Sequence, residues 1–312
     1  MNNMDKLIIN KDIKGFDKLN KEQQFFVKNY INIAQDLYNK GDKTLMEILK
    51  NQGVASEKIL DEIAKIMLKY NIKNDALNLT LIEEKRIKVD LYKKIQNLFK
   101  DEYEEENTRL TNELMEQIQD KYNSNGYLLS LGIDFTLKKI SNKDLKRILN
   151  HTIKGRNYSS RIWQNKNEVA KKVKASVGKF LKGEINLNNI EKQIKRDFEV
   201  NKMYSTRLIR NEVARVQNAA NEQFFIDNDG EHLLYSATLD NKTCGKCAAD
   251  DGKVFGINDN RPELPRHVND RCTYILLPNK DYRPSIRIDN ITKQDIDFKS
   301  YEEWLKDKNL TD

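Results

Sequence analysis

The chain has only three cysteines and four prolines among its 312 residues, and it lacks any long apolar run. An odd number of cysteines fits a reducing compartment better than a framework of disulfides. Because no stretch of eighteen apolar residues occurs, the sequence predicts no membrane-spanning helix. Residues 1–18 have no apolar core, so we also expect no secretory signal.

The motifs of the common enzyme classes are also missing. The sequence contains no G-x-x-x-x-G-K-[ST], G-x-S-x-G, H-E-x-x-H or G-x-G-x-x-G. His151 and His232 are isolated from any nucleophile or carboxylate pair, and the acidic residues show no spacing typical of a metal-dependent nuclease. We therefore assign no catalytic and no cofactor-binding residue, and we expect a protein that is not an enzyme.

Charge is abundant and unevenly distributed. Hydrophobic residues make up 38% of the chain and charged residues 33%, which favours helices with wide solvated faces. Residues 138–182 hold fourteen Lys and Arg against two acids, a net charge of +12, whereas the whole chain carries +7 and the remainder therefore −5 (7 − 12). Such a segment is either a solvated helical surface or a contact surface for DNA or an acidic partner. The candidate contact residues are Lys171, Lys172 and Lys174.

All three cysteines fall in one stretch, Cys244, Cys247 and Cys272, together with His267. The spacing is C-x2-C, nineteen residues, then H-x4-C, which is typical of a closed tetrahedral zinc site. Cys272 is the natural fourth ligand, and Asp270 is the alternative. A redox pair is the competing interpretation, but no βαβ pattern surrounds the C-x2-C. Four protein ligands leave no open position, so the pattern predicts a structural Zn²⁺ rather than a catalytic one.

The sequence predicts a mainly α fold, an elongated helical body with a small C-terminal β-hairpin and loop module that binds zinc (α+β overall). Helical periodicity covers the first 125 residues and then 138–228, with interruptions at 155–160 and Gly183. Strands are expected at 234–239, 253–255 and 273–277, and one short helix near Tyr301 and Trp304. The Asn-Ser-Asn-Gly at 123–126 predicts a break. The expected regions are an N-terminal helical region (1–125), a basic helical core (126–230), the Cys/His module (231–285) and a tail (286–312).

Several short motifs together resemble one family. Residues 236–247 (S-A-T-L-D-N-K-T-C-G-K-C), 250–255 (D-D-G-K-V-F) and 264–267 (L-P-R-H) match its cysteine core, turn and closing motif. Upstream, residues 207–212 (R-L-I-R-N-E) and 158–163 (Y-S-S-R-I-W) match two helical motifs. Over about residues 155–280 the sequence resembles the phage head morphogenesis family (minor head proteins, Mu F-like). It departs from the family pattern at Asn211, at Lys242 and at Cys272, which lies two positions beyond the usual closing cysteine.

The resemblance implies a structural phage minor head (minor capsid) protein that acts in head assembly, and in DNA packaging or delivery. It implies the portal protein and capsid or scaffold proteins as partners, packaged double-stranded DNA as a further contact, and neither a membrane nor a small-molecule substrate. The expected location is the virion head, and the host cytoplasm during assembly. The alternative is a DNA-processing enzyme or DNA-binding protein with a zinc-ribbon-like accessory module.

Overall fold

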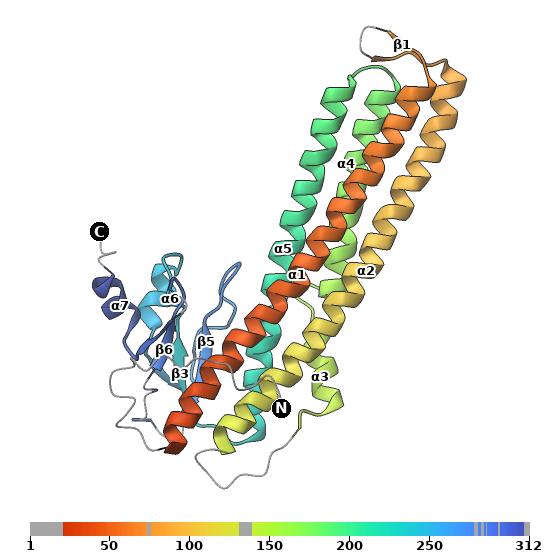
Figure 1. The fold of residues 1–312 in the computed structure, drawn as a ribbon. Coiled ribbons are helices and arrows are strands. Elements are labelled where there is room, and N and C mark those ends of the chain that lie inside the picture. The colour runs from red at the N-terminus through yellow and green to blue at the C-terminus, as the bar shows by residue number, and fades with distance from the viewer. Residues whose placement is uncertain are drawn as a thin grey trace, which may run out of the picture. The chain divides into compact units, whose positions relative to one another are not determined.

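The structure is a computed structural model of the chain, and it describes residues 21–73, 76–130, 139–277, 280–281, 284, 286–292 and 294–308. Within these residues the chain forms seven helices and seven short strands, which confirms the predicted mainly α fold with a small β part (Figure 1). The chain folds into two compact units. Unit 1 comprises Met1–Asn39, Met115–Leu149 and Val213–Asp312, and unit 2 comprises Lys40–Leu114 and Asn150–Glu212.

The helices and the strands are numbered separately, each in chain order. The helices are α1 (Lys21–Lys69), α2 (Leu81–Ser130), α3 (Asn142–Leu149), α4 (Tyr158–Leu181), α5 (Leu187–Asp227), α6 (Gly245–Asp250) and α7 (Tyr301–Asp307). The strands are β1 (Ile72–Lys73), β2 (Ala76–Leu77), β3 (His232–Ser236), β4 (Val254–Gly256), β5 (Thr273–Leu277), β6 (Ile286–Asp289) and β7 (Gln294–Asp297). None of the described helices has a stretch long and apolar enough to cross a membrane.

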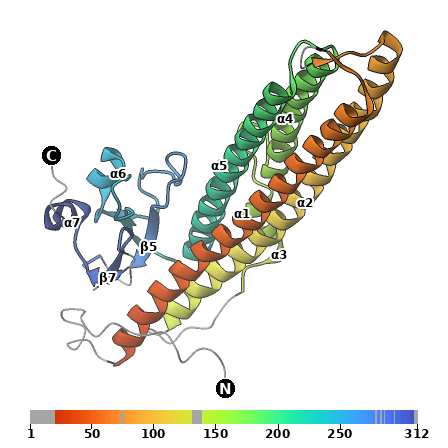
Figure 2. The same ribbon diagram turned by 45° about the horizontal axis from the view of Figure 1, so that its top comes forward.

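Unit 2 is a helical bundle in which segments of α1, α2, α4 and α5 lie side by side (Figure 2). The short β1–β2 hairpin joins α1 to α2. Apolar residues of all four helices form one buried core, which includes Ile59 and Ile63 from α1 and Leu91 and Ile95 from α2. Val173 of α4 and Ile194 of α5 are fully buried in the same core.

Side-chain caps and one glycine set the ends of α4 and α5. The Asn157 side chain accepts a hydrogen bond from the Ser160 N–H at 3.0 Å and so begins α4. Gly183 follows α4 with a φ of 71°, and a Cβ there would lie 2.7 Å from the Leu77 carbonyl oxygen. The Asn186 side chain accepts from the Asn189 N–H at the start of α5. The interruption predicted at Gly183 is confirmed. The one predicted at 155–160 is confirmed only up to Asn157, because residues 158–160 form the first turn of α4.

The break predicted at 123–126 is wrong, because α2 continues through it to Ser130. Tyr122 is fully buried, and its ring centroid lies 5.3 Å from that of Phe224. Asn125 donates a hydrogen bond to the Asn221 side chain at 2.7 Å. Packing of α2 against α5 within unit 1 therefore outweighs the weak helical propensity of Asn, Ser and Gly.

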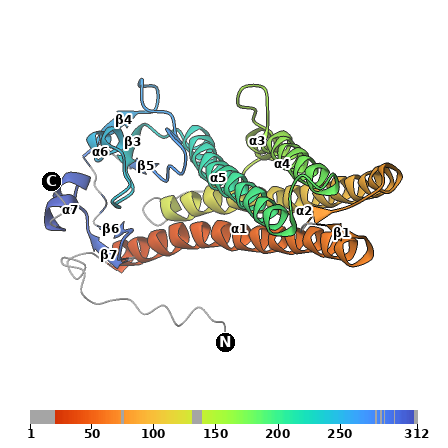
Figure 3. The same ribbon diagram turned by 90° about the horizontal axis from the view of Figure 1, so that it is seen from above.

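In unit 1 a three-stranded antiparallel sheet has the order β4-β3-β5. His232 of β3 pairs with Leu277 of β5 on one side and with Gly256 of β4 on the other. The three strands were predicted, with β5 at its predicted residues and β3 beginning two residues earlier. The β6–β7 hairpin was not predicted. Helix α6 lies beside this sheet (Figure 3), and its Cys247 joins a core made with Leu233 of β3 and Phe224 of α5.

Candidate metal centre

Helix α6 positions the first two candidate ligands. Cys244 is its N-cap residue, and its sulfur accepts a hydrogen bond from the Cys247 N–H at 3.4 Å. Residues three apart on a helical turn lie on the same face, so the two sulfurs point the same way. The hydrogen bond from the Cys247 backbone stabilises the thiolate and lowers the pKa of Cys244. Burial raises the pKa of Cys247, whose side chain is in the core.

His267 reaches the two cysteines from the loop before β5. The ligand atoms of Cys244, Cys247 and His267 all lie within 4.8 Å of one another, and the Cys247 Sγ is 3.6 Å from the His267 Nε2. Around a tetrahedral zinc, neighbouring sulfur and nitrogen ligands are about 3.5 Å apart. The His267 Nδ1 lies 3.2 Å from the Val268 carbonyl oxygen, and a proton on Nδ1 would leave the Nε2 lone pair for a metal.

The two candidates for the fourth ligand form a second cluster, Cys247, Asp270 and Cys272, whose ligand atoms also lie within 4.8 Å of one another. Asp270 already accepts two backbone hydrogen bonds, from Cys272 N–H at 2.9 Å and from Arg266 N–H at 2.7 Å, one on each oxygen. The Asp270 carboxylate therefore stabilises the backbone conformation of residues 266–272 through these two hydrogen bonds. Cys272 is buried, and this burial raises the pKa of its thiol.

The structure thus gathers all five candidate ligands around Cys247. Two sulfurs and one imidazole, from Cys244, Cys247 and His267, form a donor set that suits zinc, and the distance from Cys247 to His267 is close to a tetrahedral edge. Burial lowers the pKa of His267, but the Val268 carbonyl and the Asp270 charge outweigh it and raise that pKa. Cys244, Cys247 and His267 therefore fit a metal ion, and Cys272 or Asp270 would have to move closer to Cys244 and His267 to complete the set. Of these two, the Asp270 carboxylate is already occupied by backbone hydrogen bonds.

Sequence reasoning missed the side chains that surround these ligands. The buried hydroxyl of Tyr235 lies beside the sulfurs, and burial together with Cys247 and Cys272 raises its pKa. The Arg266 guanidinium lies 5.2 Å from the centre of the Tyr235 ring and forms an ion pair with Asp250 of α6. The alternation of β3, which places Leu233 and Tyr235 on its inner face, was the signal that could have located Tyr235.

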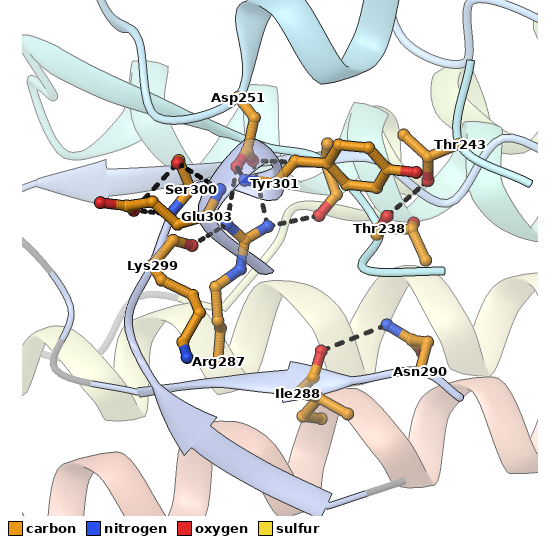
Figure 4. A network of polar contacts seen from close by, with 11 residues as sticks. Thr238, Thr243, Asp251, Arg287, Ile288, Asn290, Lys299, Ser300, Tyr301 and Glu303 are labelled. Carbon is orange, nitrogen blue, oxygen red and sulfur yellow. Dashed lines mark hydrogen bonds and ion pairs between the residues drawn. The ribbon is translucent and has the colours of Figure 1, made fainter. Parts of the chain in front are cut away.

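The C-terminal residues are attached to the same module by a buried ion pair (Figure 4). Arg287 of β6 donates to the two carboxylate oxygens of Asp251 at 2.7 and 3.0 Å, and also to the Ala237 carbonyl. Asp251 in turn accepts from the N–H groups of Ala237 and Tyr301. Trp304 of α7 is buried and belongs to one apolar cluster with Leu239. The predicted short helix is confirmed as α7, and this part of the predicted tail is folded onto the module.

The three candidate contact lysines lie on α4 in unit 2 but do not share one environment. Lys171 and Lys172 are exposed. The Lys174 ammonium donates to the Gln96 side chain at 2.6 Å and lies 5.9 Å from the centre of the Tyr92 ring. Burial lowers the pKa of Lys174. Of the three lysines, only Lys171 and Lys172 are therefore exposed enough to contact a partner through their full side chains.

The two histidines that we interpreted as incidental take part in neither metal-ligand cluster among the described residues. His151 is exposed, after the end of α3. His232 pairs within the sheet, and its Nε2 lies 3.8 Å from a carboxylate oxygen of Glu231. Neither environment suggests catalysis.

Residues 167–275 match the family model described as Phage Mu protein F like protein. The matched range begins within α4, includes all of α5 and α6, and ends within β5, so it contains all five candidate ligands. The match confirms the predicted resemblance. It supports a protein of phage head morphogenesis.

A curated relative is the NAD(+)--arginine ADP-ribosyltransferase EFV of Enterococcus faecalis (strain ATCC 700802 / V583), 25% identical over 198 residues. The similar region covers 57% of this chain and 40% of the relative, so the chain spans less than half of that protein's length. The transferase activity is what the name of that relative states. No solved structure matches the chain.

Proposed function

We propose that the chain is a structural, non-enzymatic minor head protein of a phage, associated with the portal or the capsid interior and acting in head assembly. The observation that carries this proposal is the family match over residues 167–275. A role in DNA packaging or delivery is the finer part of the proposal. It is supported by the net positive charge of residues 138–182 and by the exposure of Lys171 and Lys172.

Within this proposal, Cys244, Cys247, His267 and Cys272 hold a structural Zn²⁺. When bound, zinc would supply folding free energy by linking α6 to two points of the loop between β4 and β5. The module has little regular secondary structure that could stabilise it without such a link. Its sheet has only three short strands, and the described part of the chain between β4 and β5, residues 257–272, contains no helix or strand.

Metal content tests the ligand set. We expect mass spectrometry of the purified protein to find zinc at one ion per chain, and both Cys244→Ser and Cys272→Ser to lose it. Asp270→Asn is the comparison variant and should keep the metal, although its amide oxygen can accept only one of the two backbone hydrogen bonds that the carboxylate accepts. Zinc retained in Cys272→Ser but lost in Asp270→Asn would make Asp270 the fourth ligand, and a metal-free wild type would remove the zinc site.

The composition of phage particles tests the role itself. We expect proteomics of purified, nuclease-treated heads to find this chain in a few copies per particle, and chemical cross-linking to join it to portal or capsid protein. A chain that is abundant in the lysate but missing from assembled heads contradicts the proposal. Nuclease activity that requires a divalent metal and is lost on changing one carboxylate would instead favour the enzyme alternative.

A further inference from the structure

Unit 2 contains a layer of polar side chains buried inside its apolar bundle, which we call the bundle polar layer. Every one of the four helices contributes to it, and each side chain is less than 9% exposed. The members are Gln52 of α1, Glu102 and Glu106 of α2, Lys166 of α4, and Asn201 and Ser205 of α5. The layer holds two carboxylates but only one ammonium group, so it carries an excess negative charge when both glutamates are ionised.

The two glutamates of the bundle polar layer do not accept the same number of hydrogen bonds from neighbouring side chains. The Glu106 Oε2 lies 2.7 Å from the Lys166 Nζ and also accepts hydrogen bonds from Ser205 at 3.0 Å and Gln52 at 3.2 Å. The Glu102 Oε2 has only two donors, Lys166 at 3.0 Å and Asn201 at 3.0 Å. Glu106 is therefore the better stabilised carboxylate of the two.

Glu102 also leaves a buried oxygen without a donor. Its Oε1 is buried with no hydrogen-bond partner, and the Oε1 of Gln52 in the same layer is in the same situation. A buried acceptor without a donor costs free energy, and an uncompensated buried charge costs more. A proton on Glu102 would add a donor to the layer and remove its excess charge at the same time.

We propose that the bundle polar layer is a one-proton switch centred on Glu102, which takes up a proton as the pH falls and thereby stabilises the folded bundle of unit 2. The proton comes from solvent and forms an O–H bond on the Glu102 carboxylate. The charged groups that face it are Glu106 on its own helix and Lys166 on α4. Helix α1 contributes Gln52, and α5 contributes Asn201 and Ser205, none of which ionises.

The direction of the effect follows from the pKa of Glu102. Burial raises this pKa, and the Lys166 charge and the Lys166 and Asn201 hydrogen bonds lower it only in part. A carboxyl whose pKa is higher in the folded than in the unfolded chain stabilises the fold at low pH. That contribution is complete below the unfolded pKa of about 4.3 and is lost as the pH rises through the folded pKa.

Glu102→Gln tests the switch in the purified full-length chain. A glutamine amide mimics the protonated carboxyl, since an NH2 group in place of the Glu102 Oε1 removes the unpaired acceptor and adds a donor to the layer. At pH 8 we expect the variant to melt about 2–4 °C above the wild type, the shift that roughly a tenfold change in the folding equilibrium produces. This difference should shrink toward zero as the pH falls below the folded pKa of Glu102, where the wild type carries the proton itself.

Glu104→Gln is the matched control, since Glu104 lies on the same helix, is exposed, and forms only a 3.6 Å ion pair with Lys100. Its melting temperature should follow that of the wild type at every pH. A Glu102→Gln variant that melts below the wild type at pH 8, or by the same margin at all pH values, would overturn the switch.

Carbon-13 NMR of the glutamate carboxyls in the wild type gives a second test that needs no variant. One glutamate that titrates well above the ordinary value of about 4.3 supports the switch. Titration of every glutamate near that value overturns it. Both tests use purified protein, so their outcome is independent of whether the chain is found in phage heads.

Discussion

Asp251 holds three separate segments of unit 1 together. Its carboxylate accepts from the Ala237 N–H after β3, from the Tyr301 N–H at the start of α7, and from the guanidinium of Arg287 in β6. The side chains of Asp251 and Arg287 are only 1% and 7% exposed, so water cannot replace either partner. The aspartate of the D-G-K motif therefore stabilises the packing of the C-terminal residues against the cysteine module.

We expect Arg287→Met to destabilise unit 1 by about 3–5 kcal/mol, because it leaves the Asp251 charge buried without its counter-ion. Chemical denaturation followed by tryptophan fluorescence measures this, since Trp304 is buried in the affected region. Lys306→Met in the same region is the control, because its ion pair with Glu302 is exposed at both ends. Equal losses in the two variants would contradict the role given to Arg287.

At the scale of helices, α4 shows that similar residues can have opposite environments. Lys166 is 1% exposed, whereas Lys171 and Lys172 of the same basic segment are exposed. Helical periodicity puts Lys166 on the face of Ile162 and Val169, but a lysine is buried only when it finds a counter-ion. Glu102 supplies that counter-ion from 64 residues away, a pairing that no local pattern in the sequence indicates.

Dependence on contacts between distant segments also separates the parts of the structure that the sequence did not predict from those that it did. The helix end at Gly183 and the three strands around the cysteines depend on local chemistry and were predicted from it. The spacing of Cys244, Cys247 and His267 likewise predicted a cluster that the structure brings together. The continuation of α2 and the β6–β7 hairpin depend on contacts between distant segments, so one sequence did not indicate them.

Lys166→Met should destabilise the bundle of unit 2 by about 3–5 kcal/mol at neutral pH, since Glu102 and Glu106 would then be buried without a positive charge. The loss should decrease as the pH falls, because protonation removes the charges that the lysine compensates. Urea denaturation at pH 8 and pH 5 measures both. Lys171→Met changes the same kind of side chain at an exposed position, and we expect little effect. A loss that does not vary with pH would argue against ionised carboxylates in the layer.

For the whole molecule, the charge that reaches solvent differs from the charge counted along the chain. Residues 138–182 carry a net +12, yet Lys166 is neutralised inside the bundle and Lys174 donates to Gln96. Fewer lysine and arginine side chains are therefore available to contact DNA than the count over residues 138–182 suggests. Affinity for DNA depends on the number of phosphates neutralised, so the number of exposed lysines sets the expected salt dependence.

We expect the purified chain to bind double-stranded DNA with an affinity that falls as salt rises. Changing Lys171 and Lys172 together to Gln should reduce the slope of log affinity against log salt by about 1.8, because each phosphate contact contributes about 0.9. Lys174→Gln should change it much less, since that ammonium faces Tyr92 and Gln96. Fluorescence anisotropy between 50 and 200 mM salt, roughly the range over which such contacts are resolved, measures the slope.

Lys58 and Lys69, exposed on α1, form the control pair with the same loss of charge. An equal effect of the control pair would mean that net charge alone attracts DNA, and binding that ignores salt would remove the DNA contact from the proposed function.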